Sequence, residues 1–97
     1  MTKRAFRLGD AASGHDRCPP TTAIESSGDV FIEGLGVVRQ DDSCGAHGCQ
    51  RHSTHDRAVS GGSGSVFING RPAARVGDAI DCGGAAAAGS STVGIGD

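Results

Sequence analysis

The chain has 97 residues, with 17 glycines, three phenylalanines, no tryptophan or tyrosine, and a formal net charge of −2. This charge balance, without base-stacking Tyr or Trp, argues against nucleic-acid binding. No apolar run reaches the ~20 residues of a membrane span, and the N-terminus lacks the apolar segment of a secretory signal peptide. So small a domain, with so few large apolar side chains, usually needs a metal, disulfides or a partner for stability.

One short unit occurs three times along the chain. Each copy begins with an Arg-x-x-Asp block, at residues 7–10, 39–42 and 75–78. A variable loop and a Gly/Ser-rich turn follow, and the unit ends in a β-branched segment. We take the units as about 7–38, 39–74 and 75–97, all within the single domain 1–97, with no effector domain appended. Each recurring Arg is expected to pair with the Asp of its own block, and contact with a partner protein is the alternative.

The β-branched segments predict one short strand in each unit. They read Ser-Gly-Asp-Val-Phe-Ile-Glu-Gly at 27–34, Ser-Gly-Ser-Val-Phe-Ile-Asn-Gly at 63–70, and Ser-Ser-Thr-Val-Gly-Ile-Gly at 90–96. Glu33-Gly34 and Asn69-Gly70 suit the positive φ of tight turns. Little or no helix is expected. Because each unit is too short to bury its own apolar face, we predict an all-β domain in which the three pack with pseudo-three-fold symmetry.

Histidines and cysteines occupy equivalent places in these units. His55 and Cys82 each lie 11 residues before the strand valine of their unit, and His15 and His47 each lie five residues after the Asp of their block. Equivalent loops of pseudo-symmetric units meet at one end of the axis. Three His and one Cys converging there suit a closed tetrahedral zinc site, with iron as the minority alternative.

Other interpretations of these residues remain open. The run 44–55 holds five potential ligands and could bind a metal alone, or the His and Cys could be scattered loop residues. The even cysteine count also allows disulfides, although a chain made in the reducing cytosol rarely forms structural ones. After export, Cys44 and Cys49 are expected to be the pair most able to oxidise. Cys18 is expected to be a small packing residue.

The third block carries a specific resemblance. It reads Val66-Phe-Ile-Asn-Gly-Arg-Pro-Ala-Ala-Arg-Val-Gly-Asp78, with Cys82-Gly-Gly just beyond. This resembles the PAAR-repeat (proline–alanine–alanine–arginine) family, whose naming tetrapeptide stands intact at 72–75. Gly14-His15 and the 30–34 segment are similar to the opening of secretion-type and phage-type members. The middle block departs from the usual Pro-x-x-Arg-x-Gly-Asp pattern.

The resemblance implies a small conical β protein that caps the blunt end of a trimeric β-helical spike, one copy per trimer. That spike would be the VgrG protein of a type VI secretion system, and the tip would aid membrane puncture and effector delivery. The tip of a contractile phage or pyocin tail is the alternative, and a stand-alone zinc-binding or redox module is a third. Family members bind one zinc near the apex, which here implies the ligands His15, His47, His55 and Cys82, with His52 in reserve for His47 or His55.

The resemblance also implies where the protein acts. It would be made in the cytoplasm without a signal peptide and exported on the spike to the extracellular space or the target cell, passing transiently through a membrane. Separate effectors or adaptors could accompany it.

No catalytic residues are expected, because neither Glu25 nor Glu33 lies in a His-Glu-x-x-His arrangement. Asp16 and Asp56, beside proposed ligands, are expected to orient the imidazoles or to cap loops.

Overall fold

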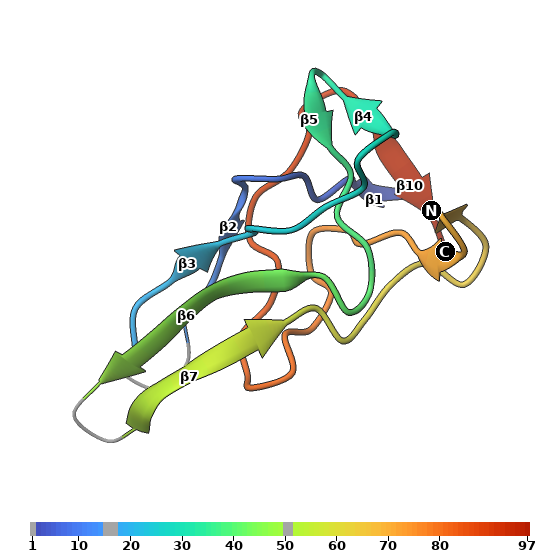
Figure 1. Cartoon of the computed structure of the whole chain (residues 1–97). Helices are drawn as coiled ribbons and strands as arrows, with labels where there is room; N and C mark the ends of the chain where they lie inside the picture. Colours follow the sequence, from blue (N-terminus) through green and yellow to red (C-terminus); the bar gives the residue numbers. More distant parts are fainter. Residues whose placement is uncertain (1, 15–17, 50–51) are drawn as a thin grey trace.

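Short antiparallel strands joined by turns make up the chain in the computed structural model, which describes residues 2–14, 18–49 and 52–97 (Figure 1). The strands are β1 (Thr2–Arg4), β2 (Ala11–Ala12), β3 (Thr21–Thr22), β4 (Phe31–Ile32), β5 (Leu35–Gly36), β6 (Ser43–Cys49), β7 (His52–Ala58), β8 (Phe67–Ile68), β9 (Arg71–Pro72) and β10 (Gly94–Gly96). The described residues contain no helix, and hence none that could cross a bilayer. The all-β prediction is therefore confirmed.

Three of the strand pairs are equivalent short hairpins, one for each repeat unit. They are β4–β5, β8–β9 and β1–β10, each antiparallel. The third differs in that β1 and β10 come from opposite ends of the sequence, with Lys3 opposite Ile95. The N-terminal strand thus completes the third repeat unit, which the sequence analysis did not anticipate.

The two continuous hairpins turn where the sequence predicts. Glu33 and Asn69 have φ of 55° and 54°, and the glycine that follows each has φ of 80°. Two successive residues with positive φ fit the right-handed twist of the flanking strands. The turn prediction is confirmed at both places.

A closed ring of backbone hydrogen bonds joins the three units. The N–H of Phe6 donates to the carbonyl of Ala74 at 3.1 Å, that of Ala74 to Val38 at 2.9 Å, and that of Val38 to Phe6 at 2.9 Å. These residues stand at the same place in their units, immediately before each Arg-x-x-Asp block. The predicted pseudo-three-fold arrangement is therefore present in the backbone itself.

The core consists of layers of three equivalent residues around this axis. The layers are Phe6, Val38 and Ala74; Ala12, Cys44 and Ile80; and Ala23, Val59 and Ala86, all buried in one cluster. Large and small side chains share each of the first two layers, so three unequal residues fill one cross-section. This lets a chain with few large apolar residues build a close-packed centre.

Each Arg-x-x-Asp block forms a turn closed by its own ion pair. The pairs are Arg7–Asp10, Arg39–Asp42 and Arg75–Asp78, each with an N···O distance of 2.9 Å. In every block the Asp carboxylate also accepts the backbone N–H of the Arg. The expectation of an ion pair within the block is confirmed.

The molecule is elongated, and its two ends differ. Its extents are 37 × 26 × 23 Å. The long strands β6 and β7 run toward one end, which we call the tip, and the three short hairpins gather at the opposite end, which we call the base (Figure 1). So long a hairpin in the second unit was not predicted from the sequence. It extends the loop in which the predicted metal ligands occur.

Candidate metal centre

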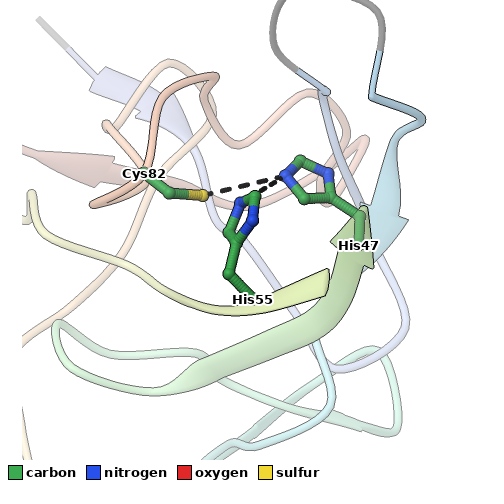
Figure 2. Close-up of side chains that lie close together, drawn as sticks. All are labelled: His47, His55 and Cys82. Carbon is green, nitrogen blue, oxygen red and sulfur yellow. Dashed lines mark hydrogen bonds between the residues drawn. The ribbon is translucent and has the colours of Figure 1, made fainter. Parts of the chain in front are cut away.

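Three of the predicted ligands lie together near the tip. His47 on β6 stands directly opposite His55 on β7, and Cys82 reaches them from the third unit (Figure 2). The two Nε2 atoms are 2.9 Å apart, and Cys82 Sγ is 3.9 Å from Nε2 of His47. All three ligand atoms lie within 4.8 Å of one another. His47 is buried, whereas His55 and Cys82 are partly exposed.

Both imidazoles are oriented by backbone carbonyls. Nδ1 of His47 lies 2.8 Å from the Pro19 oxygen, and Nδ1 of His55 lies 2.9 Å from the Ser53 oxygen. Because a carbonyl can only accept, each Nδ1 carries the hydrogen and each Nε2 presents its lone pair to the site. The Ser53 carbonyl thus orients His55. The role expected of Asp56, to orient an imidazole or to cap a loop, stays a prediction, and Asp16 lies outside the described residues.

This donor set fits a metal ion. Two nitrogen lone pairs 2.9 Å apart repel each other, and a cation held between them removes that repulsion. Around a tetrahedral zinc, neighbouring nitrogen ligands lie about 3.3 Å apart, and a nitrogen and a sulfur about 3.6 Å apart. The two separations that involve His47 Nε2 are close to these values, and all three ligand atoms lie within 4.8 Å of one another, so His47, His55 and Cys82 could hold such an ion after they adjust.

The side chains of the other two ligand candidates, His15 and His52, lie outside the described part of the structure. His15 lies outside the described residues, so its role stays a prediction. Residues on either side of it are held close to the centre, since the Ser13 carbonyl accepts from Arg57 and Cys18 is bonded to Cys49. His52 is the first residue of β7, and its side chain is outside the described part of the structure.

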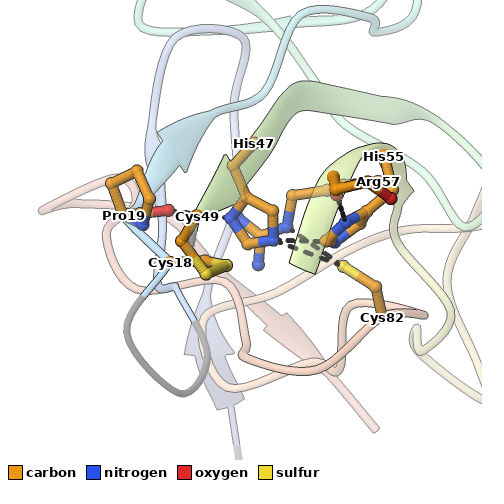
Figure 3. Close-up of a disulfide and its surroundings, with 8 residues drawn as sticks. Cys18, Pro19, His47, Cys49, His55, Arg57 and Cys82 are labelled. Carbon is orange, nitrogen blue, oxygen red and sulfur yellow. Dashed lines mark hydrogen bonds between the residues drawn. A yellow bond between two sulfur atoms is a disulfide. The ribbon is translucent and has the colours of Figure 1, made fainter. Parts of the chain in front are cut away.

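A disulfide joins Cys18 to Cys49 beside the centre (Figure 3). The expected pairing of Cys44 with Cys49 is wrong, and so is the role of Cys18 as a packing residue. Cys44 belongs to a core layer with Ala12 and Ile80, so its side chain points to the axis. Burial raises the pKa of the Cys44 thiol, chiefly by desolvation.

The positions of Cys44 and Cys49 argue against the idea that the run 44–55 binds a metal by itself. Cys44 lies in the core and Cys49 in the disulfide, so of the described side chains in this run, those of His47 and His55 belong to the three-residue group. The third member of that group, Cys82, comes from another repeat unit. The arrangement is the one expected from equivalent loops that meet at one end of an axis.

One residue of the site was missed by the sequence analysis. Arg57 is buried, and its Nε donates to Cys82 Sγ at 3.3 Å (Figure 3). Arg57 follows His55 by two residues on β7, and alternate residues of a strand share a face. That spacing was the available signal.

Comparison with known proteins agrees with this geometry. Residues 45–88 match the family model of the PAAR motif, a span that includes His47, His55 and Cys82 as well as the tetrapeptide at 72–75. No curated protein sequence matches the chain significantly. The PAAR motif is known from spike-tip proteins, and the family is structural and not catalytic. Together with the repeat units and the His/His/Cys centre, this match identifies residues 45–88 as a PAAR motif and supports a protein of the PAAR-repeat family.

Proposed function

We propose that this protein is the structural tip of a type VI secretion spike, where one copy caps and sharpens a trimeric, β-helical VgrG-like protein. The observation that carries the proposal is the polarity of the molecule. A base of three equivalent hairpins lies at one end, and a centre suited to metal binding lies near the other. The first feature suits docking on a trimer, and the second suits a rigid point.

The base offers three similar faces to a three-fold partner. Hairpins β4–β5, β8–β9 and β1–β10 are each two-stranded, so each has outer edges that could pair with strands of a spike. Phe31 and Phe67 stand at equivalent positions on β4 and β8 and are 59% and 55% exposed. Exposed aromatic side chains in such a place favour a protein interface. The third equivalent position is Gly94.

The tip would be stabilised by the metal, which we propose to be zinc. His47 and His55 belong to the second unit and Cys82 to the third, and His15 of the first unit is the proposed fourth ligand. Structural zinc contributes an apparent ~10–16 kcal/mol in small metal-folded peptides. Such a bond across loops would resist local unfolding as the tip passes a target membrane.

The same surfaces would serve a contractile phage or pyocin tail, so the partner decides between the two assignments. We propose synthesis in the cytoplasm, export on the spike, and separate effectors or adaptors as cargo. The chain itself would have no enzymatic role.

Binding to a purified, truncated VgrG trimer tests this proposal. By size-exclusion chromatography with light scattering, we expect one copy of this chain per trimer. Phe67→Asp should abolish the complex, because it places a charge in the apolar contact. Ile24→Asp is the matched control, since Ile24 is 60% exposed and its backbone bonds to Ser43 at the start of β6. Separate elution of the wild type at micromolar concentrations would contradict the proposal, and binding to a phage spike alone would favour the alternative.

A further inference from the structure

Arg57 carries a positive charge into the interior of the tip. Its side chain is among the largest that are fully buried, with 1% of the residue exposed. Burying a guanidinium is costly unless its donors are satisfied. Within the described residues, its acceptors are Thr21 Oγ1, the carbonyls of Ser13 and Gly83, and Cys82 Sγ. The three oxygens are neutral, so the sulfur is the one acceptor that can become anionic.

These four bonds connect all three repeat units. Arg57 belongs to the second unit, Ser13 and Thr21 lie in the first, and Gly83 and Cys82 lie in the third. The guanidinium therefore joins the loops that a metal at His47 and His55 would also join.

The loop in the third unit is shaped around this guanidinium. Gly84 has φ of +83°, and a Cβ there would lie 2.9 Å from Arg57 Nη2 and 2.4 Å from the Ser13 oxygen. Any side chain at position 84 would thus collide with the Arg57 bonds as well as strain the backbone. The close approach is built into the local conformation.

We propose that Arg57 is the positioning residue of the metal centre. Its Nε holds the Cys82 sulfur beside the two imidazoles, and its Nη atoms fix the loops around that sulfur. The inference rests on the metal centre proposed above and goes beyond its ligand set. A metal-bound cysteine is a thiolate, so the Nε–Sγ bond becomes charge-assisted when the ion binds. Residues that hydrogen-bond to a metal ligand in this way orient the ligand and tune the properties of the metal.

Cobalt(II) reports on this bond, because a cobalt-bound thiolate gives a charge-transfer absorption band. The test variant is Arg57→Lys, which keeps the charge but lacks the planar fork that reaches four acceptors. We expect cobalt affinity, measured by chelator competition, to fall about 10–100-fold. The band should move to lower energy, because the sulfur lone pair loses a hydrogen bond.

The matched control is Val38→Ala, which removes buried side-chain volume from the core layer of Phe6 and Ala74 and leaves Arg57 and the three proposed ligands in place. It should lower the melting temperature and leave the cobalt band in place. If Arg57→Lys does not fold, Thr21→Val removes a single acceptor of Arg57 and should move the band in the same direction by less. An unchanged band and affinity in the Arg57 or Thr21 variant would overturn the inference while the centre stands. A wild type without a cobalt–thiolate band would overturn both.

Discussion

Two free cysteines in this chain have different roles because of where the repeat places them. Cys44 occupies the same core position as Ala12 and Ile80 in the other units, and it is 2% exposed. Cys82 lies partly exposed beside His47. The residue type is the same, but one thiol packs like a small apolar side chain and the other is available to a metal.

Replacing each of these cysteines by alanine should separate the two roles. Cys44→Ala should keep one metal per chain and cost about 1 kcal/mol of unfolding free energy, because a small buried group is lost. Cys82→Ala should lose the metal. Elemental analysis and denaturant unfolding measure both effects. Loss of metal in Cys44→Ala with retention in Cys82→Ala would contradict this assignment.

Glu33 should make folding stability depend on pH. Its carboxylate accepts from Ser90 Oγ and pairs with Arg7 at 2.9 Å, and the Ser90 hydrogen bond is the largest cause that lowers the pKa of Glu33. A carboxylate with a lowered folded pKa stabilises the fold above its unfolded pKa, about 4.3 for Glu. That contribution is lost as the pH falls through the lower, folded value.

Glu33→Gln tests this dependence. The variant should be less stable than the wild type at pH 7. The difference should shrink as the pH falls from about 4.3 through the lower pKa of folded Glu33, where the wild-type carboxylate becomes protonated. Urea unfolding at a series of pH values measures it. A difference that stays constant with pH would contradict the role of the charged carboxylate.

At the scale of the elements, the turns were predictable from the sequence, whereas the pairing of β1 with β10 was not. The Arg-x-x-Asp turns and the Glu33-Gly34 and Asn69-Gly70 turns depend on contacts within about four residues, so their residues identify them. Strand β1 (Thr2–Arg4) does not resemble the Val-x-Ile segments, and its partner is at the other end of the chain. Its pairing depends on the closed three-fold arrangement.

The candidate site was predictable to a similar extent. Their equivalent positions in the repeat predicted that His47, His55 and Cys82 lie close together, and the structure places them so. The disulfide of Cys18 with Cys49 and the bond from Arg57 to Cys82 depend on how β6 and β7 extend beyond the other loops. The repeat gives no information about that extension, because the described residues of the other two units form no hairpin of this length.

The disulfide ties hairpin β6–β7 to the loop of the first unit and should stabilise the tip. It closes a loop with a sequence separation of 31, which corresponds to about 3–4 kcal/mol from the reduced entropy of the unfolded chain. A Cys18→Ser/Cys49→Ser double variant, freed of metal by a chelator, should lose about this amount. A reductant should destabilise the metal-free wild type but not the double variant, and equal sensitivity of the two would contradict the prediction.

At the scale of the whole molecule, metal and core should stabilise different ends. The ring of Phe6, Val38 and Ala74 needs no metal, whereas the loops at the tip meet at His47 and Cys82. A chelator should therefore lower the melting temperature of the wild type and leave Cys82→Ala unchanged. Hydrogen exchange should quicken first in β6 and β7 and last in the ring. Uniform loss of protection along the chain would show that the metal supports the fold as a whole.

The pairing of β1 with β10 predicts that the chain order can be changed without changing the fold. Thr2 stands opposite Gly96, so a short linker between the ends would make the third hairpin continuous like the other two. New ends at the exposed turn Asn69-Gly70 should then give a circular permutant with wild-type metal content and a similar melting temperature. The control permutant, opened between the buried residues Ala74 and Arg75, should not fold, because it puts charged termini into the core. If instead the first permutant failed to fold and circular dichroism showed a disordered chain, the three hairpins would not be equivalent, and the base would lack the symmetry needed to meet a trimer.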